Sequence, residues 1–222
     1  MQENLIDNSY ISNNAPEMDL SLYSTTTVSG IITQASQNVR NYCQVDGFLQ
    51  STVISERDRA HINSAGDLII SFRRRPVNQG DVTGIRLRTV SVNQSLTLQS
   101  GGMDIYFIGR PNTWLSYPSN YLISFGRGLM ALRGANLFYE VDYVGGYTQS
   151  FVSGYQTVPA DLQEATLLFV RDIMAKRYNP AGLDMMRQGS MQIMTRRTNA
   201  LSQFVEQARD LLDNAGYVRR VP

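Results

Sequence analysis

The chain has 222 residues and a net charge of +1, with 42% hydrophobic and 18% charged residues. This composition predicts one or two globular domains with a substantial core. The small net charge excludes a strong overall electrostatic field that would attract nucleic acid or an anionic membrane. One cysteine and one histidine exclude a disulfide framework and a cysteine zinc site.

Residues 1–24 predict an N-terminal arm, because they are rich in asparagine and serine and show no apolar period. Such a segment is poorly ordered unless it binds something. Its polar, acidic start is unlike a signal peptide. No apolar run in the chain approaches the roughly 18 residues of a membrane-spanning helix, so we expect no membrane partner.

The first helix is predicted over residues 27–44, where apolar residues recur at i, i+3, i+4 and i+7. Ser and Thr residues just before this range can cap its start. The apolar stripe consists of Val28, Ile31, Ile32, Ala35, Val39, Tyr42 and Cys43. Because Cys43 falls on the stripe, we expect a small buried thiol.

Over residues 49–149 the apolar residues instead recur at every second position. They lie in short segments rich in β-branched and aromatic residues. The segments read DLIISFR, VTGIRLRTVSVN, SLTLQ, MDIYFIG, YLISF and NLFYEVDY. No helix-length gap separates them, so the region predicts an antiparallel sheet, sandwich or small barrel. His61 lies in a polar loop of this region and is expected to be solvated.

A second helix is predicted over residues 159–178. Pro159 suits its first position, Asp161 lies in its positive first turn, and Pro180 stops it. Its apolar residues cover more than one side: Leu162, Ala165, Leu167, Leu168, Phe169, Val170, Ile173 and Met174. A helix of this kind is packed on several sides, so we expect it to be central to a core or an assembly.

A looser stretch follows, and it contains Met185, Met186, Met191 and Met194. These methionines indicate either an adaptable contact surface or loop residues that fold back on the core. A third helix is predicted over residues 199–215, with Gly216 just after its end. The short segment 217–222 reads YVRRVP.

The predicted fold class is therefore α+β: a small bundle of three main helices with a large antiparallel β insertion between the first and the second. The expected divisions are an N-terminal arm (1–24), a helical core (25–48 with 150–216), an inserted β domain (49–149) and a C-terminal tail (217–222). The first helix is placed with the other two because nothing near it in sequence would bury its stripe.

The sequence carries no catalytic or cofactor motif that we could place. It has no phosphate-binding P-loop, no G-x-S-x-G elbow and no H-E-x-x-H pair. We therefore expect no enzyme activity, no cofactor and no metal. The densest basic run, Arg73, Arg74 and Arg75, lies at a strand end before a turn. It is interpreted either as a solvated edge that blocks strand pairing or as a contact for an acidic partner or a DNA backbone.

The second helix and the residues before it resemble the head–tail connector (adaptor, or head-completion) proteins of tailed bacteriophages. The pattern GY…VP.DL..A.L..V corresponds to Gly154, Tyr155, Val158, Pro159, Asp161, Leu162, Ala165, Leu168 and Val170. The stretch DGFLQSTVISERD after the first helix is also similar to the start of such proteins. The resemblance covers residues of about 25–60 and 145–222, whereas the shortest family members have only a hairpin-sized insertion in place of the long β region.

The resemblance implies a structural virion protein of the neck, assembled in the host cytoplasm. It implies a homo-oligomeric ring, usually of twelve copies, between the portal and a tail, stopper or other neck protein. DNA would pass through the ring without sequence-specific binding, as in genome ejection. Arg73–Arg75 and the four methionines are then candidates for the ring interface.

The segment Tyr217, Val218, Arg219 and Arg220 is our candidate for portal binding. A short extended segment with two arginines can add to a sheet edge or fill a groove on a partner; the other interpretation is a frayed end. An alternative function is a carbohydrate- or protein-binding β module of a phage tail or baseplate. In that case Trp114, Tyr117 and Tyr121, which lie near turns, would stack on sugar or pack within hairpins.

Overall fold

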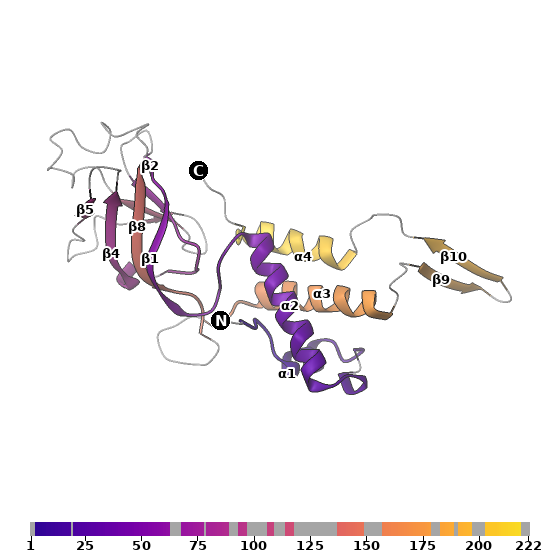
Figure 1. Cartoon of the computed structure of the whole chain (residues 1–222). Coiled ribbons are helices and arrows are strands. Elements are labelled where there is room, and N and C mark those ends of the chain that lie inside the picture. The colour runs from indigo at the N-terminus through magenta and orange to yellow at the C-terminus, as the bar shows by residue number, and fades with distance from the viewer. Residues whose placement is uncertain are drawn as a thin grey trace. The chain divides into compact units, whose positions relative to one another are not determined.

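A computed structural model describes residues 3–18, 20–62, 68–77, 79–88, 93–96, 106–108, 114–117, 137–148, 157–178, 183–188, 191–196 and 203–218. The chain divides into two compact units. The helical unit consists of Met1–Tyr42 and Pro159–Ala215, and the β unit of Cys43–Val158 and Gly216–Pro222. The fold is mixed α+β with an antiparallel sheet between α2 and α3, as predicted (Figure 1). The described residues contain four α-helices, one more than the three main helices expected.

Helix α2 (Thr25–Cys43) is the first predicted helix. Ser24 caps it, because its hydroxyl accepts a hydrogen bond from the Thr27 amide at 3.2 Å. The helix ends before Gln44, whose φ of 56° is the left-handed conformation typical of a residue that terminates a helix. The predicted stripe is buried at Val28, Ile31, Ile32, Ala35, Val39 and Cys43. The prediction of a buried thiol is thereby confirmed.

Helix α3 (Ala160–Tyr178) is the second predicted helix and begins one residue later than expected. The Gln163 amide donates to the Pro159 carbonyl at 3.1 Å, so Pro159 opens the helix without belonging to it. Its buried residues lie on more than one side: Leu162, Ala165, Thr166, Leu167, Leu168, Phe169, Val170, Asp172, Ile173 and Met174. Since successive residues of a helix point in different directions, α3 is enclosed along most of its circumference.

Helix α4 (Gln203–Asn214) is the third predicted helix, described from Gln203 onward. It lies beside α3 (Figure 1). Gly216 has a φ of 75°, which matches the predicted residue just beyond the helix end. Helix α2 also contacts α4, because the Tyr42 hydroxyl donates to Asp213 at 2.6 Å and the Arg209 guanidinium lies 5.1 Å from the Tyr42 ring centre. The three helices thus belong to one unit.

The N-terminal segment differs from its prediction. Residues 8–14 form helix α1 (Asn8–Asn14), capped by Asp7, and a 3₁₀ turn follows at Leu20–Leu22. Apolar side chains along this segment are buried, namely Leu5, Ile6, Ile11 and Ala15. The Leu5 amide donates to the Ser36 hydroxyl of α2 at 3.1 Å. A poorly ordered arm is therefore wrong for residues 3–18, because tertiary burial of a few scattered apolar residues outweighs the weak local helix preference.

The described residues of the β unit form two four-stranded sheets, one in the order β1-β8-β4-β5 and one in the order β2-β3-β7-β6. The first comprises β1 (Ser51–Arg59), β8 (Phe138–Gly145), β4 (Val82–Arg88) and β5 (Asn93–Leu96). The second comprises β2 (His61–Ile62), β3 (Leu68–Ser71), β7 (Trp114–Tyr117) and β6 (Tyr106–Ile108). All strand pairs in both sheets are antiparallel, as predicted. The predicted strand YLISF lies outside the described residues.

The two sheets share one core. Alternating residues of β8, which include Tyr139, Val141 and Tyr143, are buried together with Ile85 of β4 and Ile70 of β3. The Tyr139 hydroxyl also donates to the Ser71 carbonyl of β3 at 3.0 Å. Residues 138, 140 and 142 therefore lie on the opposite face of the first sheet, because side chains alternate along a strand.

The Met-rich stretch forms a two-stranded antiparallel sheet, β9 (Leu183–Gln188) with β10 (Met191–Arg196). In its register Met185 lies opposite Met194, and Met186 opposite Ile193. The sequence itself predicts no regular element here, because methionine has no strong strand preference. Neither strand pairs with another described strand.

We predict that Phe169→Ala lowers the free energy of unfolding of the helical unit by about 3–5 kcal/mol, because a buried aromatic side chain is replaced by a cavity. Urea titration followed by helical circular dichroism would measure this. Leu22→Ala is the matched control in the same unit, since Leu22 is 68% exposed, and should change stability by less than about 0.5 kcal/mol. Equal effects of the two variants would contradict the central position of Phe169.

Candidate interaction surfaces

The basic run Arg73–Arg75 follows β3 directly, as predicted, but Arg75 is wholly buried, with 0% of its surface exposed. Its Nε donates to the Phe72 carbonyl at 3.0 Å, and its Nη1 donates to the Tyr217 carbonyl at 3.3 Å. A solvated edge is therefore wrong for Arg75. Two backbone carbonyls of the β unit thus accept hydrogen bonds from this buried cation.

Tyr217, the first residue of the predicted portal-binding tail, is also buried in the β unit. Its ring packs edge-on against Phe48, with 5.9 Å between centroids and an interplanar angle of 87°. Burial and the hydrogen-bonded neighbour Tyr217 raise the pKa of Tyr147 above its usual value. The structure thus brings together two predicted candidates, Arg75 and Tyr217, and anchors the start of the tail.

The other two arginines of the run are also held within the β unit. Arg73 pairs with Asp58 at 3.3 Å. The Arg74 guanidinium donates to the Leu49 carbonyl, and its amide donates to the Tyr143 hydroxyl at 3.0 Å. A ring contact through Arg73–Arg75 would therefore involve arginines that already have internal partners.

Glu56 is a buried acidic residue that the sequence analysis did not single out. It accepts hydrogen bonds from the Tyr143 hydroxyl and from the Arg73 amide, the latter at 3.1 Å. Burial, followed by the negative charge of Glu56, raises the pKa of Tyr143. The residues around Glu56 are polar and charged, so the local pattern gave no signal of burial.

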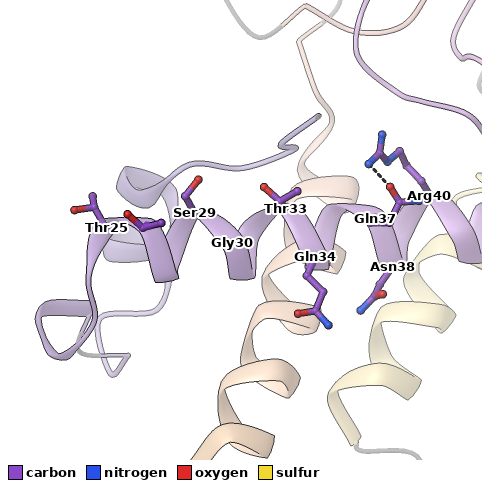
Figure 2. Close-up of a pocket in the computed structure, with 9 residues that line it drawn as sticks. Thr25, Ser29, Gly30, Thr33, Gln34, Gln37, Asn38 and Arg40 are labelled. Atoms are coloured by element: carbon purple, nitrogen blue, oxygen red, sulfur yellow. Dashed lines mark hydrogen bonds between the residues drawn. The ribbon is translucent and has the colours of Figure 1, made fainter. Parts of the chain in front are cut away.

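In the helical unit, α2 presents a polar face beside a depression of about 930 Å³. Figure 2 shows these side chains along the helix, with Ser29 and Thr33 pointing to one edge and Gln34 and Asn38 to the opposite edge. The lining residues are Thr25, Thr26, Ser29, Gly30, Thr33, Gln34, Gln37, Asn38 and Arg40. Arg40 is only 7% exposed; it donates to Gln37 and lies 3.7 Å from Glu3. Its charge is thus compensated, and the face is otherwise uncharged.

A second depression in the helical unit, of about 430 Å³, is mainly apolar. It is lined by Glu17, Met18, Leu22, Arg171, Met174, Ala175 and Phe204. Glu17 and Arg171 form an ion pair of 2.8 Å at this site. The depression has the features of a protein contact surface, with apolar residues and one charged pair among those that line it.

The remaining candidates are less informative. Arg219, Arg220 and Tyr121 lie outside the described residues, while Trp114 and Tyr117 belong to β7. Val218 is half-buried. His61 is exposed, as expected, but the prediction of a loop is wrong, because His61 belongs to β2 and pairs with Ile69 of β3. Within the described ranges, no group of three or more His, Cys, Asp or Glu residues is placed to hold a metal. None of the described helices is long and apolar enough to cross a membrane.

Comparison with known proteins adds no assignment. No model of a known protein family matches the chain, and no curated protein is significantly similar to it in sequence.

We predict that the β unit loses stability as the pH rises above about 10. The unfolded Tyr143 releases its proton near that pH, whereas the folded residue, with its raised pKa, retains it. Tyr143→Phe should make this decline shallower, while lowering stability at pH 7 by about 1–3 kcal/mol because Glu56 loses a hydrogen-bond donor. Urea titrations at several pH values would test both effects, and an unchanged alkaline decline in the variant would contradict the assignment.

We also predict that Tyr217→Ala lowers the free energy of unfolding of the β unit by about 3–5 kcal/mol, because a buried aromatic ring is lost. Val218→Ala, at the half-buried next position, should cost less than about 1.5 kcal/mol. Near-ultraviolet circular dichroism during denaturation would report on the aromatic cluster. A negligible effect of Tyr217→Ala would mean that the tail start is not part of the core.

Proposed function

We propose that this chain is a structural subunit of the head–tail connector of a tailed bacteriophage. It would form a ring adaptor, usually of twelve copies in such proteins, between the capsid portal and a tail or neck protein. The ring would surround the DNA channel in the virion neck. The role is structural, with the chain itself, the portal and the next neck protein as partners.

One observation supports this proposal most. The helical unit combines a segment before the β insertion with a segment after it, and the connector resemblance lies in the same two parts of the sequence. Helix α3, which carries most of the resemblance motif, is buried on more than one side. The β insertion is then an addition to the connector-like framework.

A ring repeats one heterologous interface until it closes, so two different surfaces of each subunit must meet. The helical unit offers two such surfaces, the polar face of α2 and the apolar depression between Leu22 and Phe204. The polar face of α2 lies within the parts of the sequence that carry the resemblance. The apolar depression lies there only in part, because Glu17, Met18 and Leu22 precede those parts. They are our candidates for the subunit contact, beside the earlier candidates in the Met-rich hairpin.

We predict that the purified full chain forms closed rings of constant copy number, alone or on portal-bearing capsids. Native mass spectrometry would give the copy number, and negative-stain electron microscopy would show a central channel. Gly30→Trp places a large side chain on the open α2 face, where nothing lies within 4 Å of an added Cβ atom, and should block assembly without unfolding the subunit. A chain that stays monomeric and does not bind such capsids would contradict the proposal.

The portal contact requires a separate test, because removing Tyr217 would also damage the β unit core. We therefore predict that a chain ending at Val218 folds normally but co-sediments less with portal-bearing, DNA-filled capsids. Arg219→Gln with Arg220→Gln is the matched variant that retains the chain length. Unchanged co-sedimentation of both variants would move the portal contact away from residues 219–222.

A further inference from the structure

Four arginines lie on the face of the first sheet that is opposite to the buried core. The strand register places Arg57 of β1 and Arg86 of β4 on either side of Glu140. It places Arg59 and Arg88 on either side of the next residue of that face, Phe138. Figure 1 shows β1, β8 and β4 side by side in this order. The result is two adjacent rows, Arg–Glu–Arg and Arg–Phe–Arg.

The two carboxylates of this face are already neutralised by arginines of β4. Glu140 Oε2 lies 2.8 Å from Arg88 Nη2 and 3.4 Å from Arg86 Nε. Asp142 lies 2.7 Å from Arg86 Nη2 and accepts a 2.6 Å hydrogen bond from the Ser55 amide. Strand β5, which pairs with β4 on its other side, adds Asn, Gln, Ser and Leu and no carboxylate.

The two arginines of β1 provide the excess positive charge. Arg57 and Arg59 are both exposed. The Arg57 guanidinium lies 4.7 Å from the centre of the Phe138 ring. This cation–π contact holds Arg57 on the face, and its charge is not neutralised by a carboxylate. In the described part of the chain, neither residue forms an ion pair. The face thus carries four arginines against two carboxylates.

We propose that this outer face of β1, β8 and β4 binds the phosphate backbone of duplex DNA, independently of base sequence. Guanidinium groups donate bidentately to phosphates. Same-face residues recur about every 7 Å along a strand, so the arginines form a regular array, which suits a polyanion with regularly spaced charges better than an acidic peptide. The proposal does not depend on the connector assignment.

The test is fluorescence anisotropy of the full chain with labelled duplexes of two unrelated sequences, from low to moderate salt. We expect equal affinity for both DNA sequences. The logarithm of the binding constant should fall linearly with the logarithm of the salt concentration, with a slope of about −0.9 for each phosphate contacted. Arg57→Gln with Arg59→Gln should weaken binding about tenfold or more at low salt and reduce the slope by about two. Glu140 retains both of its β4 partners in this variant, so the sheet should remain folded.

Arg209→Gln, compared with Arg59→Gln, is the control, because it removes an equal charge from the helical unit. The proposal is overturned if the wild-type chain does not bind, or if this control weakens binding as much as Arg59→Gln. It is also overturned if polyglutamate competes as well as unlabelled duplex, since the partner would then be an acidic protein. Should the double variant unfold, Arg59→Gln alone must reduce the salt slope by about one.

Discussion

The helical unit depends on the burial of α3. Apolar residues cover most sides of this helix, so a single packing partner would leave many of them in water. Helix α4 and neighbours from the start of the chain are needed to exclude water from them. Burial of a large aliphatic or aromatic side chain contributes about 1.5–3 kcal/mol, and α3 contains several. Arg171 of α3 also pairs with Glu17, which ties the N-terminal segment to the same helix. The β insertion is therefore accommodated without interrupting this packing.

Elements with strong local signals could be predicted from the sequence, and those formed by distant contacts could not. Three features could be predicted because each depends on a few neighbouring residues. They are the apolar stripe of α2, the burial of α3 on several sides and the glycine that follows α4. Helix α1 depends on burial of Ile11, and β1 is a mostly polar strand held by its pairing with β8. For such segments tertiary contacts outweigh local propensity. The Met-rich hairpin was missed for a different reason, because methionine has no strong strand preference.

The candidate surfaces show this limit more clearly. Arg75 and Tyr217 are 142 positions apart, so nothing in either local sequence indicates that the two are hydrogen-bonded. A basic run before a turn normally predicts a solvated edge, yet Arg75 is a core residue. The Arg–Glu–Arg and Arg–Phe–Arg rows likewise exist only through the register of β1, β8 and β4. Residue types suited to interaction can therefore be recognised in the sequence, while the pairing of strands decides which of them remain available.

The division of the helical unit into two chain segments has a consequence for biosynthesis. The apolar stripe of α2 leaves the ribosome more than a hundred residues before α3, since Cys43–Val158 intervenes. At ordinary rates of translation this delay is on the order of 10 s, which is far longer than local folding of a helix or hairpin. The β unit can thus begin to fold while α2 still exposes Ile31, Ile32 and Val39. During that interval the nascent chain carries an unprotected amphipathic helix, which is a binding site for chaperones and a hazard for aggregation on crowded polysomes.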